Sequence, residues 1–301
     1  MSERQARQAA PQHAHAAMHC NLNTVDLDAA ETFYEVVAGR APRFRSVGVD
    51  QDATMMGLGA RTSSVTAFVW DERGPRAAPA LELVRWSDPA TRAAGSHHRA
   101  GFTALGYRVP DLQRAVLSLA PLGPLVLEDL TVRGRTLHGA VLTDPDGVRV
   151  EVVEVGVGSV ADAGPALAYE RLRVTDLDRS LDWYEGIGFA VGHRRQGTAS
   201  IVLPEDPTFS LELEEHPDLA ASPSRANQRG LYRIALAVED VEVAAGALKA
   251  LDPGTPAPVF IPMEDTPTGG YTVLFLNDPD GTVVELVARP RSEVRRPLTP
   301  V

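Results

Sequence analysis

An eight-residue pattern occurs twice in this chain and constrains its fold more than any other feature. Asp-Pro-Asp-Gly, three variable residues and a Glu span 144–151, and the same pattern returns at 278–285. The starts of the two halves also match, because Val-Asp-Leu-Asp at 25–28 corresponds to Thr-Asp-Leu-Asp at 175–178. An internal repeat of this length indicates a tandem duplication, so one structural unit is present at least twice.

Each half contains a weaker copy of its own opening segment. Tyr-Arg-Val-Pro-Asp-Leu at 107–112 and Leu-Ala-Val-Glu-Asp-Val at 236–241 repeat the arrangement of a strand followed by an Asp. Four modules result, and in each the apolar spacing predicts one strand, one helix and then about three strands. The expected strands include 20–25, 64–70, 80–86, 139–143, 148–155 and 232–238.

Two local signals predict where elements begin and turn. Asp28 and Glu31 have the spacing of a capping box, which predicts that Asp28 caps the first helix. The Asp-Gly pairs at 146–147 and 280–281 predict tight hairpin turns. The carboxylate that ends each eight-residue pattern then lies on a strand shortly after a turn.

The modules divide the chain into two predicted domains of the α+β class. The first domain spans 18–155 and the second spans 168–289, with two modules in each. The stretch 156–167 is rich in Gly, Ala and Pro and predicts a linker. Residues 1–17 and 290–301 lack periodic patterns and are expected to be flexible tails.

Composition narrows the classes of partner. The 301 residues carry a formal net charge of −11, which disfavours nucleic acid and anionic membrane surfaces. Cys20 is the only cysteine, so an internal disulfide and a cysteine-based metal cluster are excluded. No apolar run has the length of a membrane span, and the first residues lack the apolar stretch of a signal peptide. We therefore expect a cytoplasmic protein that binds small molecules, with a homodimer left open.

A nucleotide cofactor is not expected. Gly57-Leu58-Gly59 begins like a dinucleotide-binding fingerprint, but Thr62 stands at the third glycine's position and no strand-turn-helix unit surrounds it.

The module organisation resembles the vicinal oxygen chelate superfamily, which includes glyoxalase I, extradiol dioxygenases and bleomycin-resistance proteins. The resemblance rests on His-x-x-Leu-x-x-Val-Asp-Leu at 19–27, Phe-Tyr at 33–34 and the two Asp-Pro-Asp-Gly-x-x-x-Glu segments, and it extends from Met18 to Ala288. It implies four βαβββ modules that pair into two glyoxalase-like half-barrel domains. It also implies a divalent metal held by the first residue of each opening strand and by a Glu on a later strand, although one scaffold of this kind supports many reactions.

These positions can be carried onto this chain one by one. The opening-strand positions, seven residues before each module's Asp, are His19, Ala104, Tyr169 and Arg233. The later-strand acids are Glu82, Glu151, Glu212 and Glu285. All four acids are present, but only one opening-strand position is a histidine.

For the first half, the resemblance implies a metal site at His19, Glu82 and Glu151, with Ala104 in the fourth place. One imidazole and two carboxylates suit Zn, Ni, Mn, Fe or Mg. Glu151 or Glu82 would then serve as the catalytic base. The alternative is that His19 hydrogen-bonds a neighbouring Glu and the metal has been lost.

For the second half, the resemblance places Arg233 between Glu212 and Glu285, where its guanidinium replaces the metal as the positive partner. Arg171 and Arg173, with Glu214, extend this into a charged network. Such arginines either form ion pairs or bind an anionic ligand. Strand alternation also places Asn21 and Asn23 on the face of His19. The expected ligand-binding residues are Asn21, Asn23, Arg108, Tyr169, Glu212, Arg233 and Glu285.

The pairing of the modules stays open at this point. Sequential pairing, first with second and third with fourth, is the simpler arrangement and is favoured. The other arrangement pairs the first module with the fourth and the second with the third. It would place His19 and Glu82 opposite Arg233 and Glu285, leaving Ala104, Glu151, Tyr169 and Glu212 as the other set.

Two functions are consistent with these residues. The first is a glyoxalase-type metal enzyme that isomerises, epimerises or cleaves a small oxygen-rich substrate through an enolate or another oxyanion. The second is a metal-free binding protein of the antibiotic-sequestering type. Extradiol ring cleavage is disfavoured, because Val141 and Phe275 occupy the positions at which the resemblance requires a Tyr.

Overall fold

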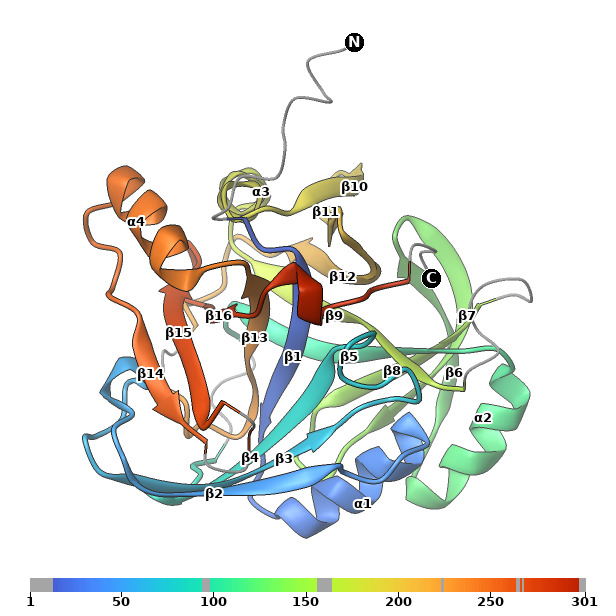
Figure 1. Ribbon diagram of the computed structural model, residues 1–301. Helices are drawn as coiled ribbons and strands as arrows, with labels where there is room; N and C mark the ends of the chain where they lie inside the picture. Colours follow the sequence, from blue (N-terminus) through green and yellow to red (C-terminus); the bar gives the residue numbers. More distant parts are fainter. Residues whose placement is uncertain are drawn as a thin grey trace.

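The computed structural model describes residues 13–93, 98–155, 164–222, 225–263, 266 and 268–297. Each of the four modules contains one strand, one helix and three strands, as predicted (Figure 1). The first has β1 (Ala16–Asn23), α1 (Leu27–Ala38), β2 (Phe44–Gln51), β3 (Thr62–Val69) and β4 (Ala80–Asp88). The second has β5 (Gly101–Val109), α2 (Leu112–Leu119), β6 (Val126–Val132), β7 (Arg135–Thr143) and β8 (Arg149–Glu154).

The second half repeats this order. The third module has β9 (Ala166–Val174), α3 (Leu177–Gly186), β10 (Ala190–Arg195), β11 (Thr198–Leu203) and β12 (Asp206–Glu215). The fourth has β13 (Gly230–Val238), α4 (Val241–Leu251), β14 (Val259–Pro262), β15 (Gly270–Asn277) and β16 (Val283–Ala288). Short 3-10 turns lie at Thr54–Met56, Ala120–Leu122 and Arg291–Glu293. In the parts of the chain that the structure describes, no helix is long and apolar enough to cross a membrane.

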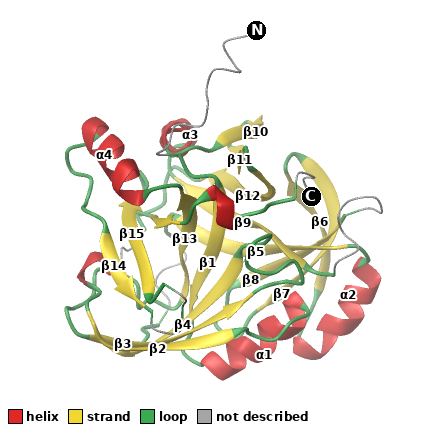
Figure 2. Cartoon of the chain, in the orientation of Figure 1, coloured by secondary structure: helices red, strands yellow, loops and turns green. Residues whose placement is uncertain are grey.

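The modules pair in two sheets of eight strands, and each sheet combines one module from each half. One sheet has the order β14-β15-β16-β13-β1-β4-β3-β2 and the other β10-β11-β12-β9-β5-β8-β7-β6. The first sheet therefore joins the first and fourth modules, and the second sheet joins the second and third. Strands dominate the molecule, and the four helices lie at its periphery (Figure 2).

The sequential pairing favoured from the sequence is wrong. β1 pairs antiparallel with β13, so that His19 lies opposite Ala235 and Asn23 lies opposite Gly230.

 In the same register Ala16 pairs with Ala237 and Asn21 with Arg233. The equivalent pair in the second sheet is β5 with β9, also antiparallel. All four opening strands carry the same alternation of apolar residues, so this alternation gives no information about which two of them pair.

The main core lies between the two sheets and beneath the helices. Alternation along β1 sends Cys20 and Leu22 into it, and the same apolar cluster contains Leu105 of β5 and Leu236 of β13. A separate apolar cluster lines part of the other face of the first sheet and includes Trp86. His19 has the opposite parity and lines a cavity on the other face of the sheet.

The repeated Asp-Pro-Asp-Gly segments join the modules to one another. Asp144 accepts hydrogen bonds from the backbone N–H groups of Asp146 and Val148, which closes the hairpin turn. Its other oxygen accepts from the Tyr34 hydroxyl of α1 at 2.8 Å. Asp146 accepts from the backbone N–H of Val25. This motif therefore fixes the second module against the first.

The second copy repeats these contacts between the fourth module and the third. Asp278 accepts from the backbone N–H groups of Asp280 and Thr282 and from the Tyr184 hydroxyl of α3. Asp280 accepts from the backbone N–H of Thr175. The hydrogen bonds thus link modules within each half, whereas the sheets link modules between the halves.

Three sequence expectations about boundaries need correction. The first helix is capped by Asp26, which accepts from the backbone N–H of Ala29, while Asp28 and Glu31 both contact Arg45 on β2. Residues 13–17 are not a flexible tail, because the backbone of this segment is already hydrogen-bonded at residue 14 and β1 begins at residue 16.

The C-terminal segment is also ordered as far as residue 297. Arg296 is buried and forms an ion pair with the buried Asp206 at 2.9 Å, so the expectation of a flexible tail from residue 290 is wrong. Residues 1–12 and 298–301 lie outside the described residues, as does most of the expected linker at 156–167. β9 begins inside the last part of that linker, at Ala166.

Candidate functional site

Four of the residues identified from the sequence meet on the first sheet. The Arg233 guanidinium donates to Glu285 Oε2 through Nε at 2.6 Å and to Glu82 Oε2 through Nη2 at 2.8 Å. His19 Nε2 lies 3.3 Å from Glu82 Oε2 and 3.6 Å from Glu285 Oε2. Glu82, Arg233 and Glu285 are buried, and the His19 side chain is 13% exposed.

The register of the strands explains why these side chains meet. Glu82 on β4, Asn21 on β1 and Arg233 on β13 form one row across the sheet. The next row contains His19 on β1, Ala235 on β13 and Glu285 on β16. The short side chains between them, Asn21 and Ala235, leave room for the longer ones to converge on one face.

This cluster does not fit a divalent metal ion. The guanidinium of Arg233 occupies the space between the two carboxylates that a metal would need, and an arginine does not lose its charge. Burial acts to lower the pKa of Arg233, but Glu82 and Glu285 more than offset that effect and hold it above the ordinary value. Within the described residues, no group of three or more His, Cys, Asp and Glu side chains is arranged to hold a metal ion.

The electrostatics agree with a permanent cation at this position. Burial alone would raise the pKa of Glu285, yet Arg233, and to a smaller extent His19, hold it at about 2. Glu285 is therefore ionised at neutral pH. Asn21 donates to Glu82 Oε2 at 2.9 Å and keeps that carboxylate in place.

The cluster forms the polar base of a cavity of about 370 Å³. The first and fourth modules supply its walls, which include Met18, Ile261, Tyr271, Val273 and Val287. Phe44, Phe68 and Trp70 form a stack along one wall, with centroid distances of 5.1 Å between the two Phe rings and 5.6 Å from Phe68 to Trp70. His19 meets Phe68 edge-on at 5.9 Å. This is a mainly apolar pocket with a few converging polar groups, which is the usual composition of a small-molecule site.

One atom in this base is left without a hydrogen bond. His19 Nε2 is buried and, among the described residues, has no partner at hydrogen-bond geometry. The two carboxylate contacts are longer than a good N–H···O hydrogen bond. The base of the cavity therefore offers an imidazole nitrogen to whatever binds there.

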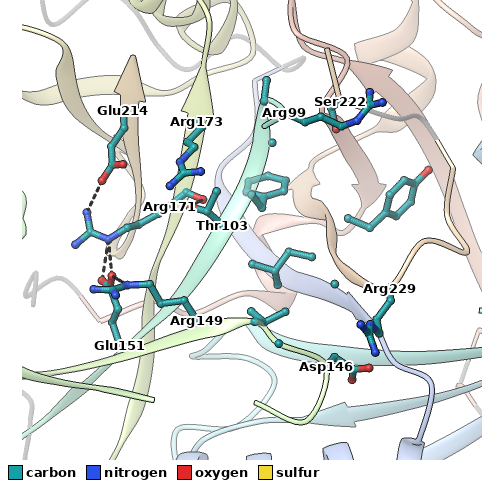
Figure 3. Close-up of a pocket in the computed structure, with 18 of the residues that line it drawn as sticks. Arg99, Thr103, Asp146, Arg149, Glu151, Arg171, Arg173, Glu214, Ser222 and Arg229 are labelled. Carbon is teal, nitrogen blue, oxygen red and sulfur yellow. Dashed lines mark hydrogen bonds and ion pairs between the residues drawn. The ribbon is translucent and has the colours of Figure 1, made fainter. Parts of the chain in front are cut away.

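Glu151 does not join His19 and Glu82, so the predicted metal set is wrong. It lies on β8 of the second sheet and accepts hydrogen bonds from Tyr169 Oη at 2.7 Å, Arg171 Nε at 2.8 Å and Arg149 Nε at 2.7 Å. Figure 3 shows this chain of charges, in which Arg171 continues to Glu214. Two guanidinium groups, those of Arg149 and Arg171, therefore contact the Glu151 carboxylate. The ion pair between Arg171 and Glu214 is present as predicted, but it is connected to Glu151 and not to Arg233.

The Glu212 carboxylate accepts hydrogen bonds from uncharged donors. It accepts from the hydroxyls of Ser200 and Ser210 and from the backbone N–H of Arg133, so it does not contact Arg233 as predicted. Ala104 lies in the second sheet opposite Arg171. The set at Ala104, Glu151, Tyr169 and Glu212 is the one that the alternative module pairing predicts.

Five expected ligand-binding residues line neither large cavity: Tyr169 and Glu212, whose contacts are given above, and Asn21, Asn23 and Arg108. Asn21 and Asn23 are buried in the sheet, where Asn21 binds Glu82 and Asn23 binds the backbone carbonyl of Gln228 and the Trp86 indole N–H. Arg108 is buried on β5, and its burial together with nearby Arg73 lowers its pKa. These three residues support the structure and do not line a binding cavity.

The aromatic stack was not identified from the sequence. A signal existed, because Phe68 and Trp70 are two residues apart and therefore share a strand face. Phe44 reaches them only through the pairing of Phe44 with Phe68 across β2 and β3. That pairing depends on the register of a long hairpin, which no local residue fixes.

Two modules that join edge to edge in a curled eight-stranded sheet, with a pocket in the concave face, define the glyoxalase-like fold. The sequence matches the Glyoxalase/Bleomycin resistance protein/Dioxygenase superfamily over residues 16–152 and 166–286, and the chain belongs to this superfamily. This confirms the resemblance stated above. No curated protein sequence matches the chain.

Solved structures agree with the fold. Glyoxalase I from Zea mays is 19% identical, with 93% of this chain and 94% of that chain covered at a TM-score of 0.64. A putative dioxygenase from Bacillus subtilis is 13% identical, with 95% of this chain and 93% of that chain covered at a TM-score of 0.63. At such identities these similarities show the shared fold alone.

Proposed function

We propose that the first-sheet pocket binds a small, ring-containing apolar molecule and that it does so without a metal ion. The observation that carries this proposal is the position of Arg233 between Glu82 and Glu285 at the base of an aromatic-walled cavity. The stack of Phe44, Phe68 and Trp70 favours a flat ligand. His19 Nε2 supplies one polar contact to it.

The test uses the neutral fluorophore N-phenyl-1-naphthylamine as a probe. We expect saturable binding whose affinity is unchanged by EDTA, together with substoichiometric metal in protein purified without chelator. Phe44→Ala removes part of the wall and is expected to weaken binding at least tenfold. Phe260→Ala is the matched control, because Phe260 is 57% exposed and lies outside the pocket.

Two results would contradict the proposal. Binding that disappears in EDTA and returns with Zn²⁺ or Ni²⁺ would show that a metal is part of the site. Equal loss of affinity in Phe44→Ala and Phe260→Ala would show that the probe binds elsewhere.

A second candidate is an enzyme that transfers protons in the same pocket. The observation that favours it is the placement of His19 Nε2 close to two carboxylates, since such neighbours orient an imidazole. Bound substrate would present its acidic C–H to His19 Nε2, and Arg233 would balance the charge that develops. This chemistry belongs to the isomerase, epimerase or lyase type and uses the residues of the chain alone.

Deuterium incorporation from D₂O into a panel of small α-hydroxy ketones tests this candidate. Exchange is expected with the wild-type protein and is expected to fall at least a hundredfold in His19→Gln, which retains the polar shape but not the basicity. Probe binding in His19→Gln separates loss of chemistry from loss of the pocket. Equal exchange in both proteins would exclude His19 as the base.

A further inference from the structure

A second cavity, of about 860 Å³, lies over the second sheet and against the segment that leads into β13 (Figure 3). Its walls come from β5, β6, β8, β9 and β12 and from residues 225–232. The arginines in its lining are Arg99, Arg149, Arg171, Arg173, Arg225 and Arg229, and the acids are Asp129, Asp146, Glu151 and Glu214. In a chain with a formal net charge of −11, such a concentration of arginines is unusual.

The acids neutralise only two of these arginines. Arg149 and Arg171 pair with Glu151, and Arg171 also pairs with Glu214. Asp129 contacts His138, and Asp146 accepts a hydrogen bond from the backbone of the first module.

The other four arginines have no acidic partner within the described part of the chain. They are Arg99, Arg173, Arg225 and Arg229, and Arg99 uses one nitrogen to donate to the Ala221 carbonyl. The cavity therefore has an excess of positive charge that the protein does not balance.

Two of these side chains also hold buried nitrogen atoms without partners. Nε of Arg173 on β9 and Nε of Arg229, just before β13, have no hydrogen-bond acceptor among the described residues. A buried donor without an acceptor costs about 1–3 kcal/mol, and more when it is charged. Figure 3 shows that Arg173 and Arg229 come from different walls of the cavity, and the hydroxyls of Thr103 and Ser222 lie on the same lining.

We propose that this cavity binds a small organic anion that carries at least two phosphate or carboxylate groups. Guanidinium groups pair with both kinds of oxyanion in two-point contacts. Unpaired arginines on separate walls favour a ligand with charges at more than one place. The volume is far larger than a single phosphate needs and is within the usual range for small-molecule pockets.

This site is separate from the apolar pocket. The two cavities share no lining residue, since Gly230, Leu231 and Tyr232 of β13 line the arginine-rich cavity and Arg233 lines the apolar one. The proposal therefore does not depend on the function proposed above, and binding at each site can be measured independently.

Isothermal titration calorimetry with pyrophosphate and with citrate, at matched ionic strength, tests the proposal. The wild-type protein is expected to bind at least one probe saturably. Arg173→Gln and Arg229→Gln are each expected to weaken that binding tenfold or more, whereas Arg173→Lys retains most of it. Arg61→Gln is the control, since Arg61 is exposed, pairs with Asp50 and lies outside the cavity.

Binding of pyrophosphate alone identifies a phosphate ligand, binding of citrate alone identifies a carboxylate ligand, and binding of both identifies a general oxyanion site. Thermal unfolding and N-phenyl-1-naphthylamine binding verify that the variants are folded. A second measurement needs no variant: phenylglyoxal modification of Arg173 and Arg229, followed by mass spectrometry, is expected to slow at least fivefold when the bound probe is present.

The proposal is overturned if neither probe binds saturably to the wild-type protein. It is also overturned if Arg61→Gln weakens binding as much as Arg173→Gln and Arg229→Gln do, or if the probe protects neither arginine from phenylglyoxal.

Discussion

At the scale of single residues, one glycine shapes the second sheet's polar cluster. Gly106 on β5 lies between Glu151 on β8 and Tyr169 on β9, at the place that Asn21 takes in the first sheet. The Tyr169 ring lies directly over Gly106, so a Cβ atom there would stand 2.2 Å from the ring carbons. The absence of a side chain is what allows the tyrosine hydroxyl to reach Glu151.

Gly106→Ala is therefore expected to displace Tyr169, break its hydrogen bond to Glu151 and lower the free energy of unfolding by about 2–4 kcal/mol, as over-packing and loss of a buried hydrogen bond do. Urea denaturation measures this. Gly192→Ala on β10 is the matched control, because the nearest atom there would be 3.6 Å away, an ordinary contact. Equal stability of the two variants would contradict the prediction.

A second residue-scale feature is a carboxyl group in the middle of the core. Glu170 on β9 is fully buried, and its oxygens make no hydrogen bond of good geometry with the described residues, although the Cys20 thiol lies near them. Burial raises the pKa of Glu170 well above its ordinary value of 4.5, so folding favours the protonated form of this carboxyl group.

This raised pKa predicts a pH dependence of stability. The stability that protonated Glu170 contributes to the folded protein is fully present below pH 4.5, the pKa of this group in the unfolded chain. It is lost as the pH rises through the folded-state pKa. Glu170→Gln is expected to remove this loss and to be more stable than the wild type at pH 8. Chemical denaturation from pH 4 to pH 8 measures the difference, with the exposed Glu185→Gln as the control. A wild-type profile that Glu170→Gln leaves unchanged would refute the assignment.

The polar residues at the base of the apolar pocket were predictable from the sequence, whereas their grouping and the aromatic wall were not. The resemblance to the superfamily implied His19, Arg233 and the four acids as site positions, and each of these positions can be found by counting along a single strand. Which strand lies beside which is a long-range property. For this reason Glu151 was assigned to the wrong partners, and Arg229, on a connection without periodicity, gave no signal.

At the scale of elements, each helix of the pair α1 and α3 is fastened to the opposite sheet by one tyrosine. Tyr34 and Tyr184 are fully buried and donate to Asp144 and Asp278. Burial raises the pKa of both tyrosines well above the ordinary value, so both hydroxyls remain protonated donors. The Phe-Tyr and Asp-Pro-Asp-Gly motifs are therefore two halves of one contact.

Tyr34→Phe and Tyr184→Phe are each expected to lower the free energy of unfolding by about 1–3 kcal/mol. In each variant the aspartate, Asp144 or Asp278, stays buried but loses a hydrogen-bond donor. Differential scanning calorimetry measures the change. Tyr271→Phe serves as the control, since the Tyr271 hydroxyl makes only a 3.4 Å contact with Arg289. Similar shifts in all three variants would mean that the hydroxyls near the aspartates contribute nothing specific.

The elements themselves were predicted well. The order of one strand, one helix and three strands in each module is confirmed, because local apolar spacing determines element type. The predicted cap of the first helix, Asp28, lies two residues after the observed cap, Asp26. Both are good cap residues, and only the backbone of the folded chain distinguishes them. The hairpin turns at the two Asp-Gly pairs are also confirmed.

At the scale of the whole molecule, the two halves of the chain are interleaved. Each sheet takes one module from each half, through the β1–β13 and β5–β9 pairs. A half-chain on its own would expose the edges of two opening strands together with the apolar residues that cover the core between the sheets. Neither half therefore has a complete sheet or a complete pocket.

Residues 1–158 and 159–301, expressed together as separate chains, are expected to associate and to recover N-phenyl-1-naphthylamine binding, whereas each expressed alone is expected to aggregate or remain unfolded. Size-exclusion chromatography and circular dichroism distinguish these outcomes. As a control, the chain is instead divided between residues 58 and 59, inside the first module, and the two unequal fragments are expressed together in the same way. Two half-chains that fold independently as monomers would show that the interleaved sheets are not required.

The interleaving also orders events in time as the chain is made. The strands of the second sheet come from one continuous stretch, from β5 to β12, so that sheet can close as soon as residue 215 has been synthesised. β1 is made first but finds its partner β13 among the last strands. Pairing of such distant segments is slow, because a long loop must close before any contact forms. The apolar pocket is therefore expected to be the last part of the protein to form, and a ribosome that stops early leaves β1 paired with β4 alone, with its other edge available to chaperones or to another chain.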